Sequence, residues 1–197
     1  MRIFEVETYL SHYKMVCPQI RDEELDYIAS ALTITQHKPK EFYLRQGQVQ
    51  KGIGFITKGL VRTFYEDEKG NEITVWFSKE NEYVTDYPSF IKQIPAKFYF
   101  QCIEPCIIVN LPFEDMQEGY SKYKNIERYG RLITEEVLVM QQLRLESFLF
   151  QNAEQRYVNF MRKYQKLLNR VSLTDLATYL GIERQSLSRI RKSLTQK

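Results

Sequence analysis

The sequence predicts an α+β protein in which short antiparallel strands lie between helical segments at both ends of the chain. Three observations support this fold class. Apolar residues recur at helical spacing before residue 34 and after residue 112, whereas residues 34–112 hold short apolar runs between polar turns. The length of 197 residues suits one large domain or two small ones, and 43% hydrophobic with 27% charged residues excludes a disordered chain.

The first forty residues are expected to be helical, because apolar side chains fall on one face at helical spacing. These side chains are Leu25, Ile28, Ala29 and Leu32. From about residue 34 the pattern changes to that of strands. Segments 60–65 and 72–77 flank a polar turn with a Gly-Asn pair that tolerates positive φ, which predicts a hairpin. Together with two later strands, 98–103 and 106–111, this spacing predicts a small β-roll or sandwich.

A long helical section is predicted from 113 to about 150. Apolar residues at spacings of 3, 4, 4 and 3 form a coiled-coil-like seam across two heptads. The seam consists of Ile126, Tyr129, Ile133, Val137 and Met140. A second apolar stripe consists of Leu132, Val139 and Leu143. We interpret this section as a dimerisation helix, and the alternative is a long core helix of a monomer. Another helix is expected at about 153–168.

The last 27 residues carry the most specific pattern. Ser172 is suited to cap a helix that ends at Gly181, a residue that readily adopts the left-handed conformation of a tight turn. A second helix should begin at Glu183 or Arg184 and continue to about Ser193. The small and apolar positions needed for two crossing helices are Leu176, Ala177, Leu180, Gly181, Ile182, Leu187 and Ile190. This spacing is typical of a helix-turn-helix motif that binds DNA.

The outer face of the second helix is polar and basic. Four residues are expected to read base edges in the major groove: Arg184, Gln185, Ser188 and Arg189. Five residues are better suited to phosphate contacts: Ser172, Thr174, Ser186, Arg191 and Lys192. Residues 141–197 carry 11 Lys+Arg against 4 Asp+Glu, whereas residues 1–140 carry 17 against 21. The basic end of the chain therefore favours a nucleic-acid partner, and a solvated basic helix face is the alternative.

The segment LGIERQSLSRI, residues 180–190, resembles the recognition segment of the Crp/Fnr family of bacterial transcription regulators. In that family an Arg-Glu pair and an Arg four residues after the Glu read bases. Arg184, Gln185 and Arg189 match those places, with Gln in place of Glu. Because Gln favours adenine whereas Glu accepts a hydrogen bond from cytosine, the usual half-site of the family is not expected.

The resemblance covers nearly the whole chain and implies three domains. It implies an effector-type domain with N-terminal helices at 1–112, similar to the cyclic-nucleotide-binding β-roll, a dimerisation helix at 113–150 and a helix-turn-helix domain at 151–197. The sequence Ala-Glu-Gln-Arg-Tyr at 153–157 is similar to the usual opening of the DNA-binding domain. The second helix is followed by few residues, so the usual β-wing is expected to be reduced or absent. Such wing-poor chains are typical of Bacteroidetes-like relatives.

The resemblance is weakest at the ligand site. Cyclic-nucleotide binders of this fold use a Gly-Glu pair for the ribose and an Arg-Ser/Thr pair for the phosphate. The best register places Thr85-Asp86 over the first pair and Lys97-Phe98 over the second. Thr85 obstructs the close approach that Gly permits, Phe98 lacks the hydroxyl, and Lys97 lacks the planar fork of Arg. Cyclic AMP or GMP is therefore not the expected effector, which stays unknown.

The cofactor is unknown, and neither a metal ion nor an iron–sulfur cluster is expected. An oxygen-sensing iron–sulfur cluster needs four thiolates, and the chain has three cysteines, of which Cys102 and Cys106 are interpreted as buried strand residues. Two separate histidines, His12 and His37, do not suggest a metal centre. A cupin-like metalloenzyme that uses the β-roll would need such a cluster, so we expect no enzyme.

These observations predict a cytoplasmic, homodimeric, sequence-specific DNA-binding regulator. Its expected partners are double-stranded DNA and a second copy of the chain, with RNA polymerase as a possible further partner. No apolar run is long enough to predict a membrane span, and no secretion signal is recognised. The alternative function is a small-molecule sensor with only residual DNA binding.

Overall fold

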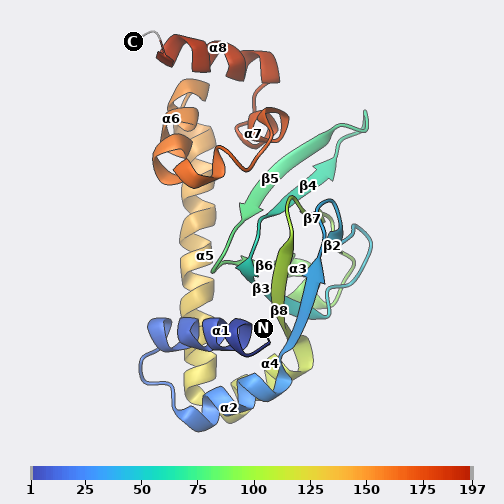
Figure 1. Ribbon diagram of the computed structural model, residues 1–197, viewed down its shortest axis with the longest axis vertical. Helices are drawn as coiled ribbons and strands as arrows, with labels where there is room; N and C mark the ends of the chain where they lie inside the picture. Colours follow the sequence, from blue (N-terminus) through green and yellow to red (C-terminus); the bar gives the residue numbers. More distant parts are fainter. Residues whose placement is uncertain (1, 196–197) are drawn as a thin grey trace. The chain divides into compact units, whose positions relative to one another are not determined.

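The computed structural model describes residues 2–195, and it confirms the α+β class. Figure 1 follows the elements along the chain. They form two units, one made of residues 1–63 with 77–137 and the other of residues 64–76 with 138–197. The boundary between the units crosses the predicted hairpin and the long helix. The sequence pattern did not indicate such a boundary.

The first unit begins with two helices, as expected. Its helices are α1 (Arg2–Val16), α2 (Asp22–Ala31), α3 (Tyr87–Lys92), α4 (Phe113–Lys122) and the first half of α5 (Lys124–Phe150). At the start of α2, the Arg21 amide donates to a Glu24 carboxylate oxygen at 2.8 Å, which satisfies a backbone donor that the helix leaves free. The helical section after residue 112 is broken at Tyr123, whose extended backbone separates α4 from α5.

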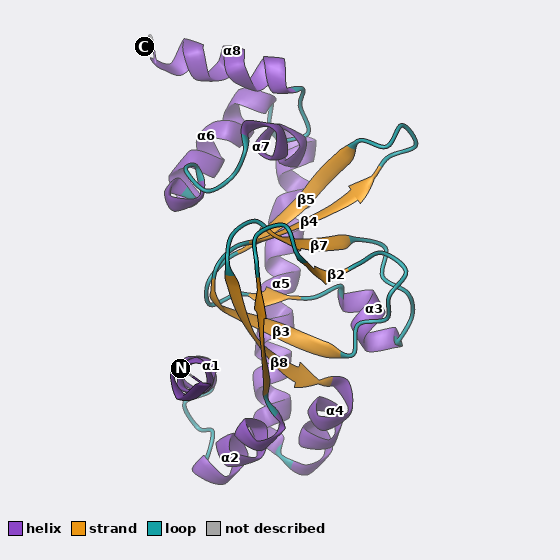
Figure 2. Ribbon diagram, turned by 45° about the vertical axis from the view of Figure 1, so that its right-hand side comes forward, coloured by secondary structure: helices purple, strands orange, loops and turns teal. Residues whose placement is uncertain are grey.

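Eight strands among the described residues form two four-stranded sheets, drawn in orange in Figure 2. Their order is β1-β8-β3-β6 in one sheet and β2-β7-β4-β5 in the other. The predicted hairpin is confirmed as β4 and β5. The strands are β1 (Thr33–His37), β2 (Phe42–Leu44), β3 (Gly52–Lys58), β4 (Val61–Glu66), β5 (Glu72–Ser78), β6 (Tyr83–Val84), β7 (Tyr99–Cys102) and β8 (Cys106–Pro112).

Alternation along the strands divides the buried side chains between two cores. Phe55 and Val109, which are partners in the antiparallel β3–β8 ladder, face the core shared with the helices. Ile56 and Ile108, their neighbours along the same strands, face the core shared with the second sheet. The β1-β8-β3-β6 sheet therefore contributes side chains to both cores.

The first half of α5 belongs to the helical core, which corrects part of the predicted dimer seam. Ile126 and Tyr129 are 0% and 3% exposed, and Ile133 packs against the same core. The Tyr129 hydroxyl lies 2.6 Å from both the His12 Nδ1 and the Tyr83 hydroxyl, so polar contacts join α5 to α1 and β6. Buried side chains of this kind offer no surface to a second chain.

The second unit contains the end of α5, the facing parts of β4 and β5, and three further α-helices. These are α6 (Ala153–Lys163), α7 (Leu173–Tyr179) and α8 (Arg184–Thr195), with a 3₁₀ turn, η1 (Gln165–Leu167), after α6. The helix predicted at 153–168 therefore changes to a tighter turn after Lys163. No strand follows α8 within residues 2–195. The Thr74 amide of β5 donates to the Thr178 hydroxyl of α7 at 3.1 Å.

Among the helices of residues 2–195, none is long and apolar enough to cross a membrane.

Replacement of Gly59 by Ala should destabilise the first unit. Gly59 has φ +102, and an added Cβ would lie 2.6 Å from the Cys106 sulfur and 2.7 Å from the Pro105 carbonyl oxygen. Left-handed strain of about 1–2 kcal/mol and overpacking of about 1–3 kcal/mol both oppose the substitution. Gly47→Ala is the matched control, since its φ is +84 and no atom lies within 4 Å of the added Cβ. Urea unfolding should give the larger loss for Gly59→Ala, and equal losses would contradict the packing argument.

Candidate nucleic-acid interface

α7 begins at the residue that the sequence predicted. The Ser172 hydroxyl oxygen accepts from the Asp175 amide at 3.0 Å, which caps the helix. The same hydroxyl donates to the Asp175 carboxylate at 2.7 Å. The Ser172 hydroxyl proton therefore forms a hydrogen bond within the chain. The phosphate contact predicted for this residue would have to break that bond.

The turn between α7 and α8 has the hydrogen bonds of a Schellman motif. Gly181 has φ +67, its amide donates to the Thr178 carbonyl at 3.0 Å, and the Ile182 amide donates to the Ala177 carbonyl at 3.1 Å. This left-handed residue turns the chain directly into α8, as the sequence predicted.

The two helices pack through the small and apolar positions of the predicted pattern. Four of these positions are almost fully buried: Leu176, Ala177, Leu180 and Leu187. Ile182 and Ile190 are half-buried. Because Leu187 and Ile190 point inward, the remaining face of α8 is left to solvent.

That outer face carries most of the predicted DNA-contacting residues. The exposed residues are Arg184, Gln185, Ser188, Arg189, Arg191 and Lys192 on α8, together with Thr174 on α7. Ser186 is half-buried. Within residues 2–195, the four cationic side chains of this face have no ion pair or hydrogen-bond partner in the chain. Cations left in water are available to an external polyanion.

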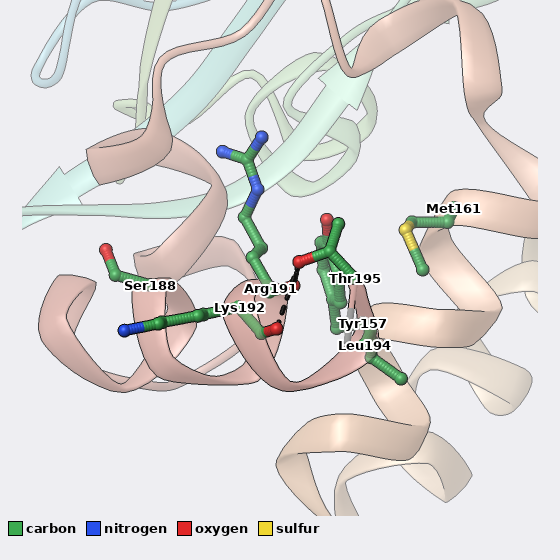
Figure 3. A pocket seen from close by; sticks show the side chains of 7 residues that line it. All are labelled: Tyr157, Met161, Ser188, Arg191, Lys192, Leu194 and Thr195. Carbon is green, nitrogen blue, oxygen red and sulfur yellow. Dashed lines mark hydrogen bonds between the residues drawn. The ribbon is translucent and has the colours of Figure 1, made fainter. Parts of the chain in front are cut away.

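A cleft of about 590 Å³ lies between α6 and α8, and Figure 3 shows the side chains that line it. They are Tyr157, Met161, Ser188, Arg191, Lys192, Leu194 and Thr195. The Thr195 hydroxyl donates to the backbone carbonyls of Arg191 and Lys192 at 3.0 and 2.9 Å. The two cations predicted to contact phosphate thus stand beside a groove with an apolar floor.

The residues predicted for a ligand site lie together in the first unit, but their polar groups contact one another. The Asp86 carboxylate caps the six-residue helix α3 by accepting from the Ser89 amide at 3.2 Å, and it accepts from the Lys97 amide at 3.1 Å. The Lys97 side chain points to solvent, whereas Phe98 packs against the core between the sheets. Thr85 donates to the Gln50 carboxamide oxygen at 3.1 Å.

Gln50 is a residue that the sequence analysis missed, and it occupies the centre of this region. Its carboxamide oxygen also accepts from the Asp86 amide at 2.7 Å, and its carboxamide nitrogen donates to the Gly52 and Val84 carbonyls at 2.8 and 3.3 Å. We call these contacts, together with those of Thr85 and Asp86, the Gln50 network. A single Gln between two strands carries no motif, so no signal in the sequence indicated it.

Cys102 and Cys106 are buried free thiols, as expected for strand residues. Within residues 2–195, no group of three or more His, Cys, Asp or Glu side chains is arranged to hold a metal ion.

Comparison with known families gives a match over the strands of both sheets. The cyclic nucleotide-binding domain family matches residues 34–123, which include all eight strands except the first residue of β1. The match covers 90 of the 197 residues. Within the matched residues, the Gln50 network lies at the positions where the sequence predicted ligand contacts. No curated protein sequence matches the chain.

Solved structures share the fold of the two sheets and of the C-terminal helices. CLP of Xanthomonas campestris, described as a c-di-GMP responsive global regulator, has a TM-score of 0.71 and 16% identity over 89% of this chain and 92% of its own. FixK2 from Bradyrhizobium japonicum has a TM-score of 0.72 and 13% identity over 84% of this chain and 85% of its own. A protein assigned to the Crp/Fnr regulators, from Eubacterium rectale, has a TM-score of 0.72 and 13% identity over 93% and 87%. The chain therefore shares the fold of these structures, as the resemblance implied.

Replacement of Gln50 by Ala should destabilise the first unit. The substitution leaves the Asp86 amide and the Val84 carbonyl without their Gln50 contacts, and several buried hydrogen bonds at about 1 kcal/mol each predict a loss of about 2–4 kcal/mol. Gln101→Ala is the control, because the Gln101 carboxamide makes one bond, to the Lys40 carbonyl at 3.2 Å. Urea unfolding followed by circular dichroism measures both losses. A Gln50→Ala loss no larger than that of the control would show that the network contributes little.

Proposed function

We propose that this protein is a sequence-specific DNA-binding transcription regulator that binds a palindromic site as a homodimer in the cytoplasm. The observation that carries the proposal is the outer face of α8, where four unpaired cations and Gln185 follow a Schellman turn. Arg and Gln side chains can make paired hydrogen bonds to guanine and adenine edges in the major groove. The global regulator CLP and the Crp/Fnr regulator from Eubacterium rectale share this fold, which agrees with the proposal.

The second half of α5 supports the homodimer. Beyond Ile133, the helix exposes a series of large apolar side chains within the second unit. They are Leu138, Val139, Leu143, Leu145, Phe148, Leu149 and Phe150. Val137 and Met140, the last two residues of the predicted seam, border this series and are exposed and half-buried. Among them Val139, Leu143 and Phe150 recur at spacings of 4 and 7, which places them on one face of the helix, and Gln141 lies on the opposite face. Exposed apolar side chains grouped on one face are typical of an interaction site, and we infer that a second copy of α5 packs on this stripe.

No effector is proposed. Thr85, Asp86 and Phe98 contact the chain through their side chains, whereas Lys97 is held through its backbone amide and its side chain is exposed. That cyclic AMP or GMP is not the effector stays an expectation from the sequence. The alternative function, a sensor with residual DNA binding, would make the outer face of α8 dispensable. RNA polymerase stays a possible partner of a DNA-bound dimer.

Two classes of substitution on α8 should weaken DNA binding differently. Arg184→Ala and Arg189→Ala should each cost about 1–3 kcal/mol of discrimination between the selected site and a mismatched site, because each removes a base-reading guanidinium. Arg191→Ala and Lys192→Ala should weaken binding to all sequences and reduce the salt dependence. Selection from random DNA, followed by titration at several salt concentrations, measures both effects.

Arg162→Ala, on the exposed face of α6, is the control for these variants and should bind as the parent protein does. If Arg184→Ala and Arg189→Ala lose the same affinity for the selected and the mismatched site, α8 contacts only the DNA backbone. Unselective binding by the parent protein would favour the sensor alternative.

A charge placed on the exposed apolar part of α5 should separate the dimer. Val139 and Leu143 are 59% and 54% exposed, and burial of a carboxylate between two apolar helices is strongly unfavourable. Val139→Glu and Leu143→Glu should give monomers in multi-angle light scattering, whereas Gln141→Glu adds the same charge to the same helix and should leave the dimer intact. Dimers in both apolar variants would place the interface elsewhere.

A further inference from the structure

The carbonyl groups at the end of α7 all have hydrogen-bond partners, but two of the partners come from other helices. The Leu176, Ala177 and Thr178 carbonyls accept from the Leu180, Ile182 and Gly181 amides of the following turn. The last two carbonyls, of Tyr179 and Leu180, accept from arginine side chains. Backbone carbonyls at a helix end have no intrahelical partner, so these guanidinium groups complete the C-terminus of α7.

The two arginines reach α7 from the two helices that precede it. Arg144 of α5 donates through Nη2 to the Tyr179 carbonyl. Arg156 of α6 donates through Nε to the Leu180 carbonyl at 2.9 Å and through Nη1 to the Gln151 carbonyl at 2.6 Å. Gln151 lies in the short link between α5 and α6, so one guanidinium joins that link to the end of α7.

Aromatic rings hold both guanidinium groups in place. The Arg144 guanidinium carbon lies 3.7 Å from the Tyr179 ring centroid and 4.4 Å from that of Phe148, and the Arg156 carbon lies 5.1 Å from Phe148. These are distances at which a cation and an aromatic face attract each other. Burial among these groups lowers the pKa of Arg144.

Phe148 also contacts the turn itself. A Cβ added at Gly181 would lie 2.8 Å from the Phe148 ring, so the left-handed residue and the ring fit closely. The second unit thus contains a cluster made of Arg144, Phe148, Arg156, Tyr179 and Gly181, which we call the arginine clamp. It joins α5 and α6 to the turn that starts α8.

We propose that Arg144 and Arg156 are positioning residues that fix the direction of α8 relative to the end of α5, and so set the distance between the two half-sites that a dimer can bind. The inference rests on the proposed function. The end of α5 carries the proposed dimer surface, and α8 carries the proposed reading residues. A dimer with firmly held reading helices discriminates sharply among half-site separations, since half-sites must lie about 34–36 Å apart, one helical turn.

Lysine substitutions test this role. Arg144→Lys and Arg156→Lys keep the positive charge but lose the planar fork that stacks on a ring while it donates a hydrogen bond. Arg162→Lys, on the exposed face of α6, is the matched control. Affinity is measured for the selected palindrome and for versions with one or two base pairs inserted or removed between the half-sites.

The parent protein and the control should reject the altered spacers, whereas each clamp variant should lose about tenfold of that discrimination while it retains selectivity within a half-site. Equal loss of affinity for all spacers would indicate a merely structural role and overturn the proposal. Unchanged discrimination would also overturn it.

Hydrogen exchange without DNA separates this proposal from the proposed function. The amides of Gly181 and Ile182 should exchange faster in both clamp variants than in the parent or the control, while the β3–β8 amides of the other unit exchange at the same rate. Unchanged exchange at the turn would overturn the clamp even if the protein binds DNA. If the amides at the turn exchange faster in both clamp variants while the parent protein binds no palindrome, the clamp holds the turn and the DNA-binding function is rejected.

Discussion

Backbone groups that leave water must find hydrogen-bond partners, and side chains distant in the sequence meet this requirement in both units. In the first unit, the Gln50 carboxamide donates to the Gly52 and Val84 carbonyls and accepts from the Asp86 amide. In the second unit, guanidinium groups serve the last two carbonyls of α7. In each place, planar polar side chains join segments that are not consecutive in the sequence. The local geometry of both candidate sites therefore depends on a few polar contacts.

The helix α5 has a different character in its two halves, although it is one continuous element of 27 residues. Its first half contributes Ile126 and Tyr129 to a buried core, whereas most of its second half exposes large apolar side chains. A periodic apolar pattern continues through both halves, because a helix face that packs within its own chain and one that packs on a partner need the same spacing. The distinction lies in what covers the face, and α1 and β6 cover it only near the start of the helix.

Features that depend on contacts within a short segment could be predicted from the sequence, whereas features that depend on distant residues could not. The turn at Gly181 and the burial of Leu176 and Leu187 could be predicted, because they depend on spacing within one short segment. The burial of Tyr129 could not, since it depends on residues such as His12 and Tyr83 from distant parts of the chain. Gln50 and Arg144 carry no local pattern at all. Comparison with known ligand sites located the region around Thr85 and Asp86. The side chain at its centre is that of Gln50, which comes from the connection between β2 and β3.

The Gln50 network has a consequence for protein design. Introduction of the Gly, Glu, Arg and Ser that a nucleotide site of this fold uses would not by itself create a site, because the Asp86 carboxylate and the Gln50 carboxamide already hold the surrounding amides. These two side chains would first have to be replaced. The backbone amides that they release would then need other hydrogen-bond partners. The order of the substitutions would therefore matter, since each intermediate has to fold before the next can bind.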